Sequence, residues 1–186
     1  MKKDQICRGL LFAGLLVTMT LFASAQSVIA YMTIDGAKTG KFKGSSTGRG
    51  NEGKIECIGF NYSVSSPRDV ASGQATGKRI HQPVRIIKPF DSSTPQLQNA
   101  LYTNEVLKTV VIEFYKRSPT GMETPFYTIT LANATISAIV QNGGTASEKV
   151  GMPNVPNEEI SFVFQKIEVN YKEGNISASD EWNSVR

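Results

Sequence analysis

A glycine-rich segment contains the strongest chemical motif in the sequence. Residues 48–54 (GRGNEGK) fit both G-x-G-x-x-G and G-x-x-x-x-G-K, two patterns that bind nucleotide phosphates. Both patterns need a helix that starts directly after the glycines, because its first amides hold the phosphate. Residues 55–60 (IECIGF) read instead as a β-strand, and Ile55 occupies the position of the magnesium-binding serine or threonine. We therefore predict a flexible basic loop rather than a nucleotide site.

Nucleophiles and metal ligands are scarce in this sequence. It has one histidine, His81, and two cysteines, Cys7 and Cys57. A zinc site draws about four ligands from cysteine, histidine and carboxylate side chains, so no metal centre is expected. Cys57 lies in an apolar run that is typical of a small buried side chain. No local signature supports a catalytic pair of Cys57 and His81.

Glu158 and Glu159 are candidates for an acid–base pair of carboxylates. Neighbouring residues of a strand point to opposite faces, so these two carboxylates do not converge on one substrate. The simpler interpretation is a solvated loop end. With no converging set of reactive groups, we predict no catalytic residues, no cofactor and no metal, and a protein that is not an enzyme.

The elements that position these residues are mostly strands. Apolar and polar residues alternate along much of the chain, as in half-buried β-strands. The segments with this pattern are 28–34, 55–64, 79–87, 110–115, 127–131, 134–140 and 160–171. Within 160–171 the apolar positions change face after Gln165. This change predicts either a bulge or a strand that passes from the core to a subunit interface.

One segment has the pattern of a short helix. Residues 91–95 (DSSTP) supply Ser93 or Thr94 as a cap and a proline for the first turn. Three apolar residues then share one helical face: Leu97, Ala100 and Leu101. We predict a helix at about residues 95–103. The fold class is mainly β, a two-sheet β-barrel or sandwich with this one short flanking α-helix.

The N-terminus has the pattern of an export signal. Three zones follow one another: the basic residues Lys2, Lys3 and Arg8, the apolar run 9–22, and the small residues 23–25. We predict that residues 1–25 are a cleaved signal peptide and that residues 26–186 form a single domain. An uncleaved membrane anchor and a wrongly assigned start codon remain as alternatives. An anchor usually needs about 20 apolar residues, more than this run supplies.

Cleavage changes the charge and the cysteine chemistry of the protein. Loss of Lys2, Lys3, Asp4 and Arg8 lowers the net charge from +4 to +2. This small charge does not favour nucleic acid or an anionic membrane as a partner of the mature form. Cys57 would then be the one remaining cysteine, which excludes an intramolecular disulfide.

Several spaced motifs lie between residues 77 and 131: Gly77-Lys78-Arg79, His81-Gln82-Pro83, 91–95 (DSSTP), 104–107 (NEVL) and 127–131 (YTITL). Together they resemble the Hcp family, the haemolysin-coregulated proteins that form the inner tube of type VI secretion systems. Residues 31–36 (YMTIDG) resemble the first strand of the family. Residues 162–171 (FVFQKIEVNY), with Trp182, resemble its last part. The similarity covers nearly the whole predicted mature chain.

This resemblance implies a β-barrel of two sheets with a helix on its side. It also implies hexameric rings that stack into a tube, a spike protein at the tip, a surrounding sheath and effector cargo in the lumen. The protein would be secreted, with a role in virulence, and the family has no catalytic residues to carry over. Exposed loops of the family contribute to ring stacking, so residues 41–53 are a candidate contact loop. Its candidate contact residues are Lys41, Lys43, Arg49, Asn51 and Glu52.

The predicted signal peptide departs from the family pattern. A type VI tube assembles in the cytoplasm, whereas the general secretion (Sec) route would bring the subunit into the periplasm. The alternative function is therefore a Sec-exported Hcp-like binding module that acts outside the secretion machine. A pilus subunit is a further alternative. Pilins usually carry a disulfide and a strand-like C-terminus, and residues 180–186 (DEWNSVR) do not resemble such a strand.

Overall fold

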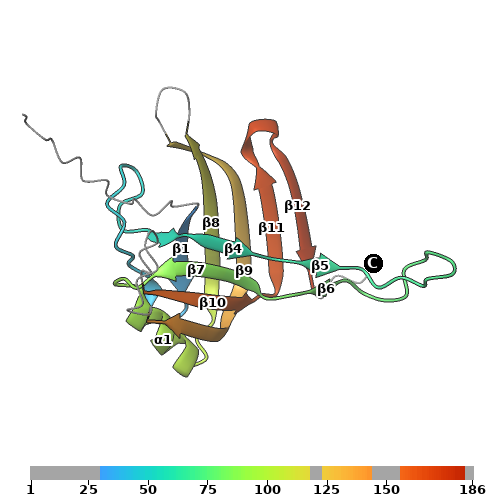
Figure 1. The fold of residues 1–186 in the computed structure, drawn as a ribbon, viewed down its shortest axis with the longest axis horizontal. Helices are drawn as coiled ribbons and strands as arrows, with labels where there is room; N and C mark the ends of the chain where they lie inside the picture. Colours follow the sequence, from blue (N-terminus) through green and yellow to red (C-terminus); the bar gives the residue numbers. More distant parts are fainter. Residues whose placement is uncertain (1–29, 118–122, 144–155, 183–186) are drawn as a thin grey trace, which may run out of the picture.

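The computed structural model describes residues 30–117, 123–143 and 156–182. The predicted signal peptide, 1–25, and Cys7 lie outside these residues. The described chain is mainly β with one α-helix, as predicted (Figure 1). The strands are β1 (Ala30–Gly36), β2 (Gly40–Lys41), β3 (Ile55–Cys57), β4 (Gly59–Asn61), β5 (Val64–Ser65), β6 (Ile80–His81), β7 (Val84–Pro89), β8 (Leu107–Arg117), β9 (Glu123–Asn142), β10 (Asn157–Val163), β11 (Lys166–Tyr171) and β12 (Ile176–Glu181). The helix is α1 (Thr94–Tyr102), and a 3-10 turn, η1, covers Lys172–Gly174.

The strand β9 belongs to both layers of the fold. Residues 127–132 pair with β11, and residues 135–142 pair with β10. Between these stretches Asn133 has a φ of 48°, a left-handed conformation that asparagine adopts more readily than most residues. One layer holds β2, β3, β1, β8, β11 and β12, and the other holds β10, β7 and β4 (Figure 1). Among the described strands no pairing joins β2 to β4, so the sheet does not close into a barrel.

The core lies between the two layers and beneath α1. Its fully buried apolar side chains come from both layers and from the helix, and they include Met32, Ile34, Ile86, Leu97, Ile112, Leu131, Ile160 and Phe162. Each such side chain contributes about 1.5–3 kcal/mol by leaving water. The alternation seen in the sequence of β8 is confirmed, because Val110 and Ile112 are buried while Val111 and Glu113 are only partly so.

The predicted helix is confirmed, but its capping differs from the prediction. α1 starts at Thr94, with Leu97 and Ala100 buried. Ser93 occupies the N-cap position but makes no side-chain capping bond. The Asp91 carboxylate instead accepts hydrogen bonds from the Ser93 amide at 2.9 Å and from its hydroxyl at 2.5 Å. Within the described ranges no helix is both long and apolar enough to cross a membrane.

The predicted strand 160–171 is two strands. β10 ends at Val163 and pairs with β7 and β9, whereas β11 starts at Lys166 and pairs with β9 and β12. The chain therefore crosses from one layer to the other near Gln165. Phe164 and Ile167, on either side of the crossing, are both buried. The change of apolar face after Gln165 thus marks a passage between layers, not a bulge within one strand.

Candidate functional site

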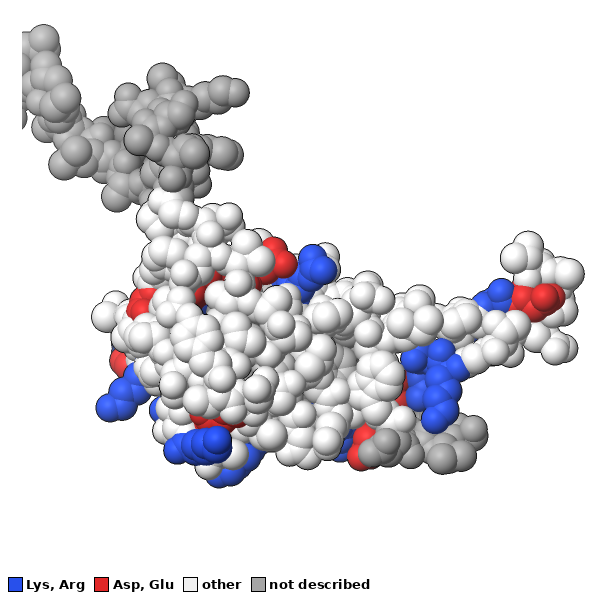
Figure 2. Space-filling model, turned by 90° about the horizontal axis from the view of Figure 1, so that it is seen from below, with Lys and Arg blue, Asp and Glu red and all other residues white. Residues whose placement is uncertain are grey.

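A long exposed hairpin is the most prominent surface feature of the described chain. We call residues 63–82 the arm. Its two limbs pair through β5 and β6, and an isolated bridge joins Arg68 to Ala75 nearer the tip. The arm projects well beyond both layers (Figures 1 and 2). Every residue from 63 to 80 except Pro67 is exposed, and Val70 at the tip is completely exposed.

The arm has no core of its own. Val64, Val70 and Ile80 expose apolar surface that a partner could cover. An isolated two-stranded hairpin is marginally stable in water, so the arm depends on the contacts at its base. The arm was not predicted from the sequence, because residues 65–78 contain few apolar positions. The unusual length of this polar segment was the available signal, since long loops in compact domains are often functional.

The candidate contact loop, 41–53, lies against the body of the domain. Lys41, Lys43, Arg49 and Glu52 are exposed, but Asn51 is buried. The loop is closed on itself by backbone bonds from Gly44 N to Gly53 O, at 2.9 Å, and from Ser46 N to Lys54 O, at 3.2 Å. Four of the five candidate contact residues therefore have side chains available to a neighbouring molecule.

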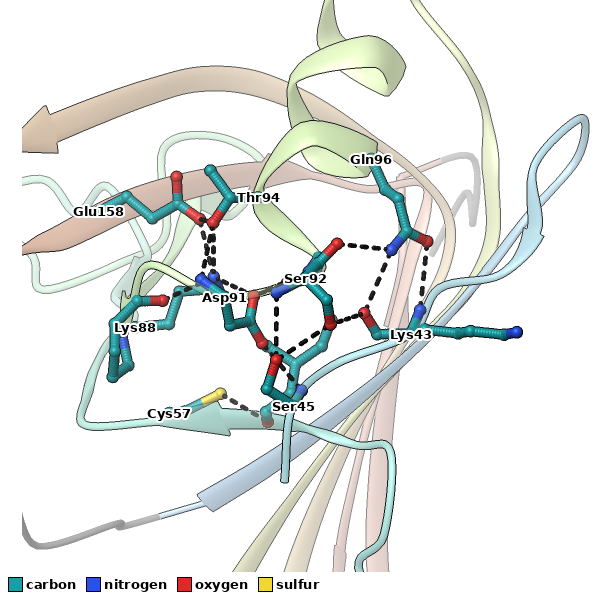
Figure 3. Close-up of polar contacts among 12 residues, drawn as sticks. Lys43, Ser45, Cys57, Lys88, Asp91, Ser92, Thr94, Gln96 and Glu158 are labelled. Atoms are coloured by element: carbon teal, nitrogen blue, oxygen red, sulfur yellow. Dashed lines mark hydrogen bonds and ion pairs between the residues drawn. The ribbon is translucent and has the colours of Figure 1, made fainter. Parts of the chain in front are cut away.

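Polar contacts also tie this loop to the start of α1 (Figure 3). The Lys43 amide donates to Gln96 Oε1 at 3.2 Å, and the Lys43 carbonyl accepts from Gln96 Nε2 at 3.1 Å and Ser92 Oγ at 2.9 Å. The Ser45 amide donates to Asp91 Oδ2 at 3.2 Å. The loop is thus a fixed part of the surface beside the helix, in contrast to the projecting arm.

The glycine-rich motif forms a turn that leads into a strand. The Asn51 amide donates to the Gly48 carbonyl at 2.8 Å, and β3 begins directly after Lys54. No helix therefore follows to hold a phosphate. The Lys54 ammonium instead binds Glu113 Oε2 at 2.6 Å and the Tyr115 hydroxyl at 3.2 Å. This geometry agrees with the predicted loop in place of a nucleotide site, but backbone and side-chain bonds hold the loop, so it is not the flexible segment that was predicted.

The reactive side chains singled out in the sequence have separate structural partners. Cys57 is fully buried, and burial raises the pKa of its thiol to about 12. His81 bonds to Tyr62 and Asp180, not to Cys57. Within the described part of the chain no group of three or more histidine, cysteine or carboxylate side chains could hold a metal ion.

The expectation of a solvated Glu158–Glu159 pair is wrong for Glu158. Both residues lie within β10 and face opposite sides, but Glu158 is fully buried and Glu159 only half-buried. The Lys88 ammonium, also fully buried, binds Glu158 Oε1 and Asp91 Oδ1, each at 2.8 Å (Figure 3). Thr94 Oγ1 donates to Glu158 Oε1 at 2.8 Å. This buried network joins β7, β10 and the start of α1.

Comparison with known proteins identifies the family. A family model described as "Type VI secretion system effector, Hcp" matches residues 31–171. The chain belongs to the Hcp family. The predicted signal peptide lies outside the matched residues. Hcp proteins are structural, secreted proteins of type VI secretion systems and are not an enzyme family.

Individual relatives agree with this assignment. The "Major exported protein" of Pseudomonas aeruginosa is 35% identical over 164 residues, which cover 83% of this chain and 95% of that protein. A mutant of Hcp1 from Escherichia coli has a similar structure, with a TM-score of 0.72 and 29% identity over 84% of this chain and 99% of that one. The structure of the secreted protein Hcp3 of Pseudomonas aeruginosa is also similar, with a TM-score of 0.66 and 29% sequence identity. The match covers 85% of this chain and 100% of that one.

Proposed function

We propose that this protein is the ring-forming inner-tube subunit of a bacterial type VI secretion system and a carrier of effector cargo. The membership of the chain in the Hcp family carries this proposal. The rings are hexameric and stack into a tube. The spike protein at the tip, the sheath around the tube and the cargo in its lumen are the further partners.

The strand edges of the described domain suit such an assembly. β12 pairs with β11 alone, so its other edge has no strand partner in the described chain. At the far end of the second layer, β7 is the one described strand that pairs with β4. Exposed edges invite pairing or burial against another subunit, and ring closure satisfies them through a heterologous interface. We therefore place ring contacts at these edges.

Stacking between rings needs a surface that reaches beyond the subunit. The arm has this reach, since residues 63–80 are almost entirely exposed and their tip carries the apolar Val70. The candidate contact residues Lys41, Lys43, Arg49 and Glu52 offer a second, fixed and mostly basic surface. We propose that the arm makes the principal contact with the next ring. Residues 41–53 would then add charge contacts, with Asn51 supporting the loop from inside.

The proposed location is outside the producing cell. The name "Major exported protein" of the relative from Pseudomonas aeruginosa supports export. The route is a separate proposal, because residues 1–25 have the pattern of a Sec signal and a tube subunit loads from the cytoplasm. If the secretion machinery uses the predicted signal, residues 1–25, the protein passes through the periplasm on its way out of the cell. The comparisons give no support to the alternative of a binding module outside the machine.

The export route can be tested in the producing bacterium. We expect the protein in the culture medium of the parent strain and not in that of a strain without the contractile sheath. Deletion of residues 1–25, with a new start at Gln26, should then leave export unchanged. Sheath-independent export that is lost with residues 1–25 would contradict the tube function. A periplasmic marker protein serves as the control for cell leakage.

A further inference from the structure

The base of the arm is attached to β12 through one carboxylate. Arg79 donates from Nε and Nη2 to the two oxygens of Asp180, a bidentate pair. His81, two residues further along the same limb, places Nε2 2.9 Å from Asp180 Oδ2. Bidentate arginine–carboxylate pairs fix direction as well as distance. Asp180 therefore holds two side chains of one limb of the arm, Arg79 and His81.

The histidine is itself enclosed between groups of the body. Its side chain is 8% exposed, and its ring lies 5.6 Å from the Phe164 ring and 5.5 Å from the Trp182 ring, centre to centre. Its other nitrogen, Nδ1, lies 2.6 Å from the Tyr62 hydroxyl at the start of the arm. The contacts of His81 thus join both ends of the arm to β12 and to the segment that precedes β11.

The direction of the hydrogen bonds follows from the charge of Asp180. The bidentate bond to Arg79 lowers the pKa of Asp180 to about 2, so at neutral pH the carboxylate only accepts. His81 must then donate from Nε2, and the Tyr62 hydroxyl, which can donate or accept, is the hydrogen-bond partner of Nδ1. Each contact in the chain Tyr62–His81–Asp180–Arg79 therefore pairs a donor with an acceptor. Such a matched network specifies one geometry.

Open space beside this attachment would let an unattached arm move. A cleft of about 420 Å³ separates the limb of the arm from the end of β12. Its lining includes Ala75, Gly77 and Lys78 on the arm and Glu181 and Trp182 beside it. Beyond His81, toward the tip, the residues of this limb are exposed, so they pack little against the body of the domain. The angle of the arm therefore depends on the polar network at its base.

We propose that Arg79, His81 and Asp180 are positioning residues for assembly, which fix the angle at which the arm leaves the subunit and so prepare it to meet the next ring. The part of this inference that concerns stacking rests on the proposed tube function. If the arm samples many angles, only the molecules whose arm has the angle needed for contact can bind the next ring. The apparent affinity between rings is then proportional to the fraction of such molecules. A tenfold fall in that fraction gives a tenfold weaker contact between rings.

The test uses residues 26–186 with Asp180→Asn, which removes the charge and keeps the size of the side chain. Nitroxide labels at Val70→Cys and Lys108→Cys report the distance between the arm tip and the body, with labelled subunits diluted in unlabelled ones. Cys57 is buried and stays unlabelled. We expect a narrow distance distribution in the parent and a broad one in Asp180→Asn, with an unchanged melting temperature. Asp180→Glu, which keeps the carboxylate, should recover much of the narrow distribution.

Stacking is measured on the same proteins without labels. We expect Asp180→Asn to form rings normally and to need about tenfold more protein for stacks to appear. The matched control is Glu168→Gln, which removes one exposed carboxylate from β11. An equally narrow distance distribution in parent and Asp180→Asn would overturn the proposal, and so would unchanged stacking. A parent protein that forms no rings would overturn the tube function instead, and the distances alone would then decide the attachment.

Discussion

Replacing Lys88 by methionine is expected to destabilise the protein by about 3–5 kcal/mol. Lys88 and Glu158 are fully buried, and the ammonium lies 2.8 Å from Glu158 Oε1 and 2.8 Å from Asp91 Oδ1. Methionine fills the same volume but leaves two carboxylates facing each other without a counter-charge. The cost is therefore that of uncompensated buried charge rather than of lost packing. Equilibrium unfolding in urea at one fixed protein concentration measures the change.

A double variant separates this charge effect from packing. Adding Glu158→Gln to Lys88→Met removes one of the two stranded carboxylates, so we expect part of the lost stability to return. The matched control is Lys108→Met, which makes the same change at an exposed position of β8 and should cost less than about 0.5 kcal/mol. Equal urea midpoints for Lys88→Met and Lys108→Met would contradict the account of the buried network.

Removing the tip of the arm is expected to abolish the stacking of rings and to leave the rings intact. The change replaces residues 67–76 with Asn-Gly, which closes a two-residue hairpin turn and keeps Arg79 and His81. The deleted residues are almost all exposed and contribute nothing to the core, so the melting temperature should stay the same. The next ring would then lose its contact with the apolar Val70. Electron microscopy should show single rings in place of tubes.

A second variant compares the arm with the contact loop predicted from the sequence. Exchanging Lys43 and Arg49 for serine removes two exposed charges of residues 41–53 and leaves the backbone bonds of the loop in place. We expect weaker stacking at high salt concentration in the parent and a smaller effect of salt in this variant, because exposed charges are screened. Tubes of normal length from the protein without the arm tip would show that residues 41–53 carry the contact.

The sequence predicted those parts of the fold that depend on local patterns. The alternation in β8 predicted which side chains are buried, and residues 91–95 predicted the start of α1 within one residue. The change of apolar face after Gln165 was visible, but its meaning required knowledge of the partner strands. β10 and β11 both pair with β9, at opposite ends of that strand. Local sequence contains no record of such pairing.

The candidate site was harder to predict for two physical reasons. Charged residues normally indicate a solvated surface, yet Lys88 and Glu158 stabilise each other in the core across 70 residues of sequence. The attachment of the arm has the same long-range character, since Arg79 and Asp180 are 101 residues apart. Three-dimensional neighbours of this kind cannot be inferred from one sequence. The predicted export signal lies outside the described residues and stays a prediction.

The number of subunits in the assembled particle is the most direct test of the tube function. Native mass spectrometry of residues 26–186, at a protein concentration where rings of Hcp proteins are expected to persist, gives this number without any labelling. We predict a dominant species with six times the subunit mass, together with its multiples where rings stack. A stable monomer under the same conditions would contradict the proposal that this protein builds the tube.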